Sequence, residues 1–333
     1  MTPSLSIVIP VYDEPDWIGR SVTAADRAVA ISLFDTAEIV VVDDGSGPAT
    51  QTALDRLSTR TEIRVLRQAT NRGRFAARRR GIEEARGELV LLLDARVLLG
   101  EDALRFLGEH WTPDRAVWNG HCMINREGNP YARFWETLTR AALPEYLANP
   151  RTTSFGIEDY DRFPKGTGHF AAPRELLLEA IVEFRSHYSD TRFASDDTHL
   201  LRAVARRQRI NISPGFPSLY HGRTNLRGFL RHAFHRGTSF VDSFARPGSR
   251  FLPVLLAVPP VSTLALAIAV RRPRLAAGVA LAAPVVAAGA ALRWRRPWPD
   301  VIAFAALVPP FALTFVAGIW RGVLLLLRAR STR

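Results

Sequence analysis

The sequence predicts an α/β domain followed by transmembrane helices, and two observations support this prediction. Strand-like and helix-like patterns alternate over residues 5–93, and charged residues are spread evenly up to about residue 246. Beyond that point come three long apolar stretches that contain no acidic residue. The alternation is typical of a mostly parallel sheet with helices on both faces. Stretches of about 20 apolar residues are long enough to cross a bilayer.

The elements of the α/β domain follow one another closely. Apolar, β-branched runs predict strands at 5–11, 38–42, 63–67 and 88–93. Helical apolar spacing predicts helices at 18–33, 50–57 and 75–85. Ligands of such sheets bind beyond the carboxyl ends of the strands. Acidic residues gather at those ends, namely Asp13, Glu14, Asp43, Asp44 and Asp94.

The apolar stretches predict a membrane domain over 251–333, with helices at 251–270, 275–292 and 301–320. Pro-Pro pairs interrupt the first and third stretches, where we expect kinks or half-spans. An arginine-rich segment follows each stretch. Simple alternation of spans would place two of these three basic clusters outside the cell. A hairpin or re-entrant arrangement therefore stays open.

The segment 225–250 joins the two parts and carries arginines and histidines among phenylalanines at roughly helical intervals. We expect a basic amphipathic helix at the membrane interface, with aromatics toward the acyl boundary and arginines at lipid phosphates. A solvated surface helix is the alternative. Residues 1–224 would then form the α/β domain.

Composition narrows the compartment and the partners. The 333 residues carry a formal net charge of +12, which suits nucleic acid, anionic lipid or phosphorylated small molecules. One cysteine excludes a disulfide within the chain and a cysteine metal cluster. The first ten residues lack the pattern of a signal peptide, so we expect a cytosolic α/β domain anchored to the cytoplasmic membrane. Residues 72–80 are basic but hold one aromatic and no nucleic-acid motif, so we expect no nucleic-acid partner.

Five short motifs occur in order along the chain. They lie at residues 7–14 (IVIPVYDE), 42–46 (VDDGS), 71–74 (NRGR), 87–96 (GELVLLLDAR) and 195–202 (SDDTHLLR). In this order and spacing the set resembles family-2 glycosyltransferases of the GT-A fold, a Rossmann-like fold of nucleotide-diphospho-sugar transferases. The resemblance covers about residues 5–240. Taken alone, the Asp43–Asp44 pair reads as an acidic turn and the Asp196–Asp197 pair as a helix cap.

The resemblance implies a role for each matched residue. Asp197, with Asp196 beside it, is the expected base that takes a proton from the acceptor hydroxyl during inverting transfer. Gly166 and Gly168 match the acceptor-side loop. The expected donor-binding residues are Pro10, Tyr12, Glu14, Asp43, Asp44, Asn71, Gly73, Arg78, Asp94 and Arg96.

The acidic triad of the family departs from its pattern here, because it reads Asp94-Ala95-Arg96. In the family both acids help to hold a divalent cation, Mg²⁺ or Mn²⁺, at the nucleotide diphosphate. Arg96 cannot bind a cation, but its guanidinium suits a diphosphate directly. Asp94 and His221 are the remaining candidate metal ligands, although a lone histidine is more often a surface or core residue. We expect a weakened or replaced metal requirement.

The sequence therefore predicts a membrane-anchored glycosyltransferase that moves a sugar from a nucleotide-sugar to a lipid-linked or cell-envelope glycan acceptor. One alternative is a polyprenyl-phosphate glycosyltransferase, whose acceptor is the lipid phosphate itself. The proline-rich segment expected after the triad in that subgroup is absent. A second alternative is a catalytically silent scaffold that binds nucleotide-sugars at the membrane.

Overall fold

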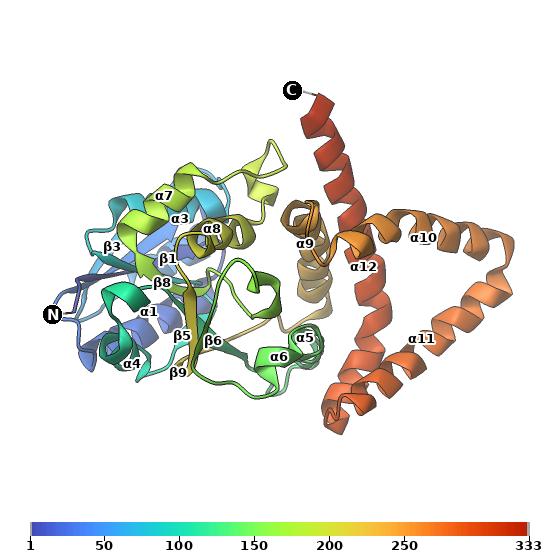
Figure 1. Ribbon diagram of the computed structural model, residues 1–333, viewed down its shortest axis with the longest axis horizontal. Helices are drawn as coiled ribbons and strands as arrows, with labels where there is room; N and C mark the ends of the chain where they lie inside the picture. Colours follow the sequence, from blue (N-terminus) through green and yellow to red (C-terminus); the bar gives the residue numbers. More distant parts are fainter. Residues whose placement is uncertain (1, 332–333) are drawn as a thin grey trace. The chain divides into compact units, whose positions relative to one another are not determined.

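The strands form one mixed sheet in the computed structural model, which describes residues 2–331 (Figure 1). Within these residues the sheet has nine strands, in the order β3-β2-β1-β4-β8-β6-β9-β5, with β7 paired to β9. Strands β3, β2, β1 and β4 are parallel, whereas β8 pairs with both β4 and β6 in the antiparallel direction. The strands are β1 (Leu5–Val11), β2 (Ala37–Asp43), β3 (Glu62–Arg67), β4 (Leu89–Leu93), β5 (Val97–Leu99), β6 (Trp118–Ile124), β7 (Thr153–Phe155), β8 (His169–Pro173) and β9 (Ile210–Tyr220).

Both faces of the sheet are buried, as the continuous apolar strands predict. Along β1, Ile7 and Ile9 pack with the helices α1, α2 and α4, whereas Val8 between them packs with α3, α7 and α8. This alternation follows from the two-residue period of a strand. The six helices are α1 (Pro15–Ala30), α2 (Pro48–Asp55), α3 (Arg74–Glu84), α4 (Ala103–His110), α7 (Arg174–Val182) and α8 (Asp196–Ala205).

The chain divides into two compact units. The first comprises residues 1–123, 145–185 and 196–221, and it contains the sheet together with these six helices. The second comprises 124–144, 186–195 and 222–333. The second unit therefore includes two short excursions from within the α/β part of the sequence.

The second unit is helical. Its helices are α5 (Pro130–Ala142), α9 (Leu226–Phe244), α10 (Leu252–Arg271), α11 (Pro273–Arg293) and α12 (Trp298–Ser331), with a short turn η3 at Thr191–Phe193. Further short helices lie wholly or partly outside the second unit. The helices η1 (Pro113–Arg115) and η2 (Tyr160–Arg162) belong to the first unit, and α6 (Pro144–Leu147) lies at the boundary between the two in the sequence. Helices α10, α11 and α12 are long and apolar enough to cross a membrane, by length and composition alone.

The helices α10 and α12 run through their Pro-Pro pairs without a break. A hydroxyl within four residues donates to a carbonyl at each pair: Thr263 Oγ1 lies 2.9 Å from the Pro259 carbonyl oxygen, and Thr314 donates to the Pro310 carbonyl. Each hydroxyl donates to a carbonyl of the proline pair itself, whereas the carbonyl that lacks an amide donor because of a proline lies four residues earlier in the helix. Kinks expected from the sequence therefore do not divide either helix into two elements.

Helices α9 and α12 cross at glycine. A Cβ added at Gly237 would lie 2.1 Å from the Phe315 carbonyl oxygen, and one at Gly318 would lie 2.1 Å from the Phe234 carbonyl oxygen. The backbones touch directly, as small residues allow between helices in membranes. Phe229, expected from the sequence to face lipid, is instead fully buried against aromatic rings of α5 and α12.

Candidate functional site

The carboxyl ends of β1, β2 and β4 lie side by side in the parallel half of the sheet. The sequence places acidic residues at or just beyond each end, because Asp13 follows β1, Asp43 ends β2 and Asp94 follows β4. These acids share one edge of the sheet. Their side chains nevertheless do different things.

The first acidic pair builds the backbone around it. Asp43 is buried, and its Oδ1 accepts from the Ser46 amide at 2.9 Å. Asp44 is also buried and accepts from the Arg72 amide at 2.8 Å and the Gly73 amide at 2.9 Å. Burial raises the pKa of the Asp44 carboxyl, and these two amides oppose that rise. The pair thus fixes the turn after β2 and the loop that leads into α3.

That loop carries the predicted residues Asn71 and Gly73. The Asn71 side-chain oxygen accepts from the Gly73 amide at 3.1 Å, and Gly73 has a φ of 92°. A positive φ of this kind favours glycine, which explains the residue at this position. Gly45 has a φ of 74°, and an added Cβ there would lie 2.6 Å from the Thr70 carbonyl carbon. The two turns are therefore packed backbone against backbone.

At the end of β1, Pro10 lies within the strand and Tyr12 is exposed beyond it. Asp13 adopts a positive φ of 51° and its Oδ1 accepts from the Gly47 amide at 2.9 Å. This contact holds the turn after β1 against the turn after β2. Tyr12, in the loop between β1 and α1, is exposed at the same edge of the sheet.

The second acidic pair surrounds a buried arginine. Arg78 of α3 is 1% exposed and donates to Asp94 Oδ1 at 2.5 Å, to Asp196 Oδ2, and to Asp197 Oδ1 at 3.4 Å. Arg74, one turn earlier, has a nitrogen 3.9 Å from Asp196 Oδ1. The acid that ends β4 and the two acids that open α8 are thus gathered around one guanidinium.

The loop before β8 completes this cluster. Thr167 Oγ1 donates to Asp197 Oδ1. A Cβ added at Gly166 would lie 3.7 Å from Asp197 Oδ2, and one at Gly168 would lie 2.9 Å from Asp94 Oδ2. The predicted acceptor-side glycines therefore lie against the two acids. Thr167 was not singled out from the sequence, although its position between the two matched glycines would have indicated it.

Charge is unbalanced in this cluster. Burial disfavours a charged guanidinium, yet Asp196, Asp94 and Asp197 together raise the pKa of Arg78 above its ordinary value, so it stays charged. Burial raises the pKa of the Asp196 carboxyl, Arg78 opposes the rise, and the nearby Asp197 adds to it. Asp196 is 2% exposed, whereas the Asp197 side chain is 29% exposed. Asp197 is therefore the more accessible member of the pair.

Arg96 forms a separate group beside the cluster. Its NH1 lies 2.8 Å from Glu14 Oε2, and its Nε donates to the His221 carbonyl oxygen at 2.7 Å. Its guanidinium lies 5.0 Å from the Trp17 ring, which in turn packs 4.4 Å from the His221 ring. Burial lowers the pKa of His221, and the nearby cations Arg96 and Arg20 lower it further. The structure thus brings together Glu14 and Arg96, predicted to bind the donor, and His221, predicted as a metal ligand.

A two-acid metal site does not fit these residues. Asp94 is bound by Arg78, and the position of the second acid holds a cation that pairs with Glu14. Among residues 2–331, no group of three or more His, Cys, Asp or Glu side chains is placed to hold a metal ion. A hard divalent cation needs several oxygen ligands, so the chain by itself offers a poor site.

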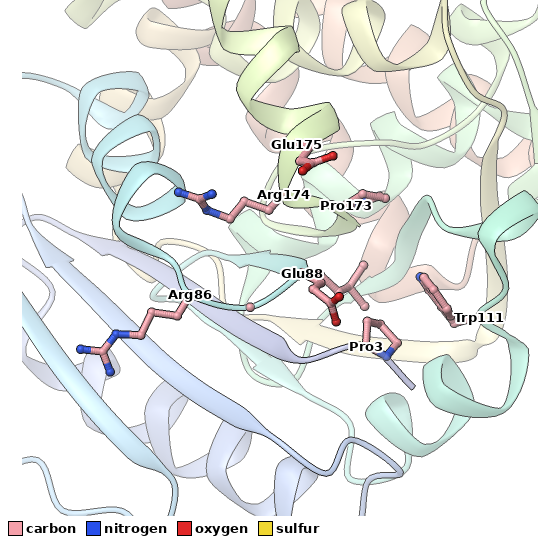
Figure 2. A pocket seen from close by; sticks show the side chains of 9 residues that line it. Pro3, Arg86, Glu88, Trp111, Pro173, Arg174 and Glu175 are labelled. Carbon is pink, nitrogen blue, oxygen red and sulfur yellow. The ribbon is translucent and has the colours of Figure 1, made fainter. Parts of the chain in front are cut away.

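The surface also has a hollow of about 360 Å³ at the opposite end of the sheet (Figure 2). It lies at the start of β4 and the end of β8, between Glu88, Trp111 and Arg174. Arg174 donates to the carbonyl oxygens of Ile82 and Glu83 at the end of α3. Since ligands of parallel sheets bind at the carboxyl ends of the strands, this hollow is not the donor site.

Known proteins share this type of fold. The sequence profile of the family described as Glycosyl transferase family 2 matches residues 6–179, more than half of the chain. In structure, the chain is similar to the mannosyltransferase PcManGT from Pyrobaculum calidifontis, solved in complex with GDP-Man and Mn²⁺. The TM-score is 0.59 at 20% identity, over 97% of this chain and 88% of that one. This likeness shows the fold, an α/β domain of the GT-A type.

The names of the sequence relatives are more specific than the description of the family. The undecaprenyl-phosphate 4-deoxy-4-formamido-L-arabinose transferase of Pseudomonas aeruginosa is 37% identical over 187 residues, which are 54% of this chain and 50% of that protein. The GalNAc(5)-diNAcBac-PP-undecaprenol beta-1,3-glucosyltransferase of Campylobacter jejuni is 27% identical over 130 residues, 38% of this chain and 40% of that protein. The chain thus spans half or less of the length of these curated relatives.

Proposed function

Because the chain belongs to glycosyl transferase family 2, we propose that it transfers a sugar from a nucleotide-sugar to a lipid-linked acceptor, with inversion at the anomeric carbon. The observation that carries this proposal is the cluster in which Arg78 holds Asp94, Asp196 and Asp197 together. Asp94 directly follows β4, at the edge where nucleotides bind in such sheets. The cluster therefore joins the expected donor edge to the expected base.

The reaction follows from these positions. The acceptor oxygen forms a bond to the anomeric carbon while the bond from that carbon to the diphosphate oxygen breaks. Asp197 takes the proton of the acceptor hydroxyl, and the nucleoside diphosphate leaves with the bonding electrons. Arg78 and Thr167 hold Asp197 in place. Positioned proton acceptance of this kind contributes about 10²- to 10⁴-fold in rate.

The leaving diphosphate needs positive charge beside it. Arg96 lies near the same edge, where Glu14 and the His221 carbonyl hold its guanidinium. A diphosphate that displaces Glu14 from Arg96 would receive the bidentate hydrogen bonds that guanidinium groups give to phosphate. This supports a donor site in which an arginine supplies charge that a cation supplies in other members of the family.

The acceptor is proposed from the relatives and from the C-terminal helices. The two sequence relatives described above act, according to their names, on undecaprenyl phosphate and on a diphosphate-linked undecaprenol glycan. Three helices long and apolar enough to cross a membrane follow the α/β part. Confinement of enzyme and acceptor to one membrane surface supports a lipid-linked acceptor, with the α/β domain in the cytosol.

The two relatives suggest two acceptor groups, a sugar hydroxyl and a lipid phosphate. These groups differ in whether they need a base during the attack. A sugar hydroxyl must lose a proton as it attacks, so it needs Asp197. A lipid phosphate is already ionised near neutral pH, because its second pKa is about 6. It therefore gains little from a base. The exposed position of Asp197 and its contact with Thr167 favour a hydroxyl acceptor, and lipid phosphate is the second candidate.

A donor and acceptor panel tests the proposal. The full chain is purified with lipid, and release of nucleoside diphosphate is measured for several nucleotide-sugars, each with polyprenyl phosphate, with a polyprenyl-diphosphate-linked sugar, or with no acceptor. We expect one donor to give release that depends on the hydroxyl acceptor, together with a product that is heavier by one sugar. Asp55→Asn, an exposed acid on α2, is the matched control and should behave as wild type.

Three results separate the candidates. Product from polyprenyl phosphate alone would favour the second candidate. Tight donor binding without product from any acceptor would favour the silent scaffold. Failure of every nucleotide-sugar to bind would contradict the proposal altogether.

A further inference from the structure

The start of α12 is fixed by a buried acid. Asp300, in its first turn, is fully buried, and its carboxylate accepts from Arg126 at 3.0 Å and from Arg133 at 2.9 Å. Arg296, just before the helix, is the third cation. A buried carboxylate requires such partners, so this end of α12 is held on the segment 124–133.

A later part of α12 is fixed by a different segment. The Arg321 guanidinium lies 4.2 Å from the Phe193 ring. A Cβ added at Gly322 would lie 2.7 Å from the Tyr188 hydroxyl oxygen, and that hydroxyl donates to the Thr238 carbonyl oxygen of α9 at 2.6 Å. Residues 186–195 therefore hold α12 one bilayer thickness further along, since 21 residues of helix span about 32 Å.

Both holding segments are tethered to the α/β domain by short lengths of chain. Arg126 stands two residues after Ile124, which ends β6, so it lies within about 7 Å of that strand's end. The ten residues 186–195 follow Arg185 and precede Asp196, which both belong to the first compact unit. A ten-residue segment that leaves a domain and returns to it can extend at most about 20 Å from that domain. This distance is less than the roughly 30 Å thickness of a hydrocarbon core. Neither segment can stand across the membrane from the α/β domain.

From these tethers we infer that α12 lies along the membrane surface on the side of the α/β domain, and that α10 and α11 are the helices that cross. The exposed face of α12 is apolar, which suits a position along the membrane surface. Ile302, Leu313 and Leu324 are 64%, 76% and 52% exposed. They are eleven residues apart, close to three full turns, so they form one apolar stripe along the helix. The partner of this stripe is the acyl region of the near leaflet.

The pair α10–α11 has the form of a crossing hairpin. The two helices meet at Arg272, away from α12, and α11 then returns to pack on the first turns of α12 (Figure 1). They are 6% and 11% buried, against 28% for α12, at equal mean hydropathy of 2.1. Both ends of the hairpin are held on the near side, where Arg250 donates to the Ala142 carbonyl oxygen at 3.1 Å and Arg296 pairs with Asp300.

This arrangement also accounts for the arginine clusters. Three consecutive crossings would place two basic clusters on the far side. With α12 on the surface, the clusters at 293–296 and 328–330 both stay with the α/β domain, and the cluster at 271–274 alone is exported. That distribution agrees better with the excess of arginine in cytoplasmic segments.

Depth measurements test the inference on the full chain. Cys122, the single cysteine, is replaced by serine, and Ile302→Cys, Leu313→Cys and Leu324→Cys each receive a fluorescent label. The protein is placed in vesicles of phosphatidylethanolamine and phosphatidylglycerol that carry quenchers at defined acyl depths. We expect the three labels to report one shallow depth. A crossing helix would separate neighbouring labels by up to about 16 Å and would contradict the inference.

The matched control is α10, which carries exposed valines. Labels at Val254→Cys, Val261→Cys and Val270→Cys should report different depths. An independent measurement uses Arg272→Cys, Arg295→Cys and Arg328→Cys with a maleimide that cannot cross membranes, added to sealed vesicles of known orientation. We expect position 328 to react from the same side as 295, and 272 from the other side. Reaction of 328 together with 272 would overturn the inference even if a stripe variant failed to fold.

Discussion

The two aspartate pairs of this chain look alike in the sequence and differ in the structure. The side-chain oxygens of Asp43 and Asp44 accept hydrogen bonds from backbone amides of nearby turns. Asp196 and Asp197 face a guanidinium, and Asp197 keeps a partly exposed side chain. The first pair therefore shapes a loop, whereas the second leaves one acid accessible beside a buried arginine. Paired acids after a strand do not by themselves reveal which of these tasks they perform.

The largest expected effect comes from removing the centre of the second pair. Arg78→Met leaves three carboxylates gathered without their shared cation, and breaking a buried ion pair costs about 3–5 kcal/mol. We expect a markedly lower melting temperature and loss of transfer. Arg79→Met is the matched control, because the neighbouring Arg79 is 56% exposed and pairs with Glu83. Equal melting temperatures for the two variants would show that the cluster is not what holds these elements together.

The first pair should respond through donor binding. Asp44→Ala leaves the Arg72 and Gly73 amides without their acceptor, at a cost of about 1–3 kcal/mol for each buried group left unsatisfied. We expect weaker binding of the nucleoside diphosphate in calorimetry. Asp43→Ala removes the acceptor of the Ser46 amide and should weaken binding less. An equal effect of both variants would mean that the acids touch the nucleotide themselves, as the sequence comparison implied.

The next prediction concerns Arg96 and the metal requirement of donor use. Arg96→Ala should impair donor use with or without Mg²⁺ or Mn²⁺, because the diphosphate loses a cation. Arg96→Asp should raise the metal requirement, since it restores an oxygen ligand. The measurement is donor turnover with chelator and with each metal, and Arg20→Ala, also beside Trp17, serves as the control. Normal turnover of Arg96→Ala with metal, alongside a wild type that chelator abolishes, would rule out a role at the diphosphate.

The smallest effect at neutral pH concerns a histidine beside the acceptor-side loop, because its protonation matters only as pH falls. Burial lowers the pKa of His169 from 6.5 to about 3, and His121 nearby adds to the shift. The folded state therefore holds the neutral ring while the unfolded chain binds a proton. This contribution to stability is fully present above pH 6.5 and is lost as pH falls toward 3. His169→Gln should flatten the pH dependence of the melting temperature in that window, and an unchanged slope relative to His110→Gln would contradict this.

Much of the fold could be predicted from the sequence because local patterns specify it. The strands and helices of residues 5–93 lie within a few residues of their expected positions. The antiparallel half of the sheet was not foreseen, because β5, β6, β7 and β9 are short or carry no clear alternation and pair over long separations. The membrane helices were found by composition, but composition could not show that α12 packs on α5 and α9.

The members of the candidate site were named from the motifs, whereas the contacts between them were not. Motif order indicated Arg78, Asp94 and Asp197 as site residues but could not show that Arg78 lies between the acids. Long-range pairing of this kind depends on how α3, β4 and α8 pack, which no local pattern contains. The same holds for Glu14, which the structure joins to Arg96 across 82 positions.

The most direct measurement compares turnover and donor affinity in Asp197→Asn. With a hydroxyl acceptor, we predict a loss of about 10²- to 10⁴-fold in turnover, while affinity for the nucleoside diphosphate stays that of the wild type. Asp190→Asn, a partly exposed acid of the segment 186–195 that leads into α8, should leave both quantities unchanged. If Asp197→Asn kept more than about half of the wild-type turnover with that acceptor, proton acceptance by this residue could not be what drives the reaction.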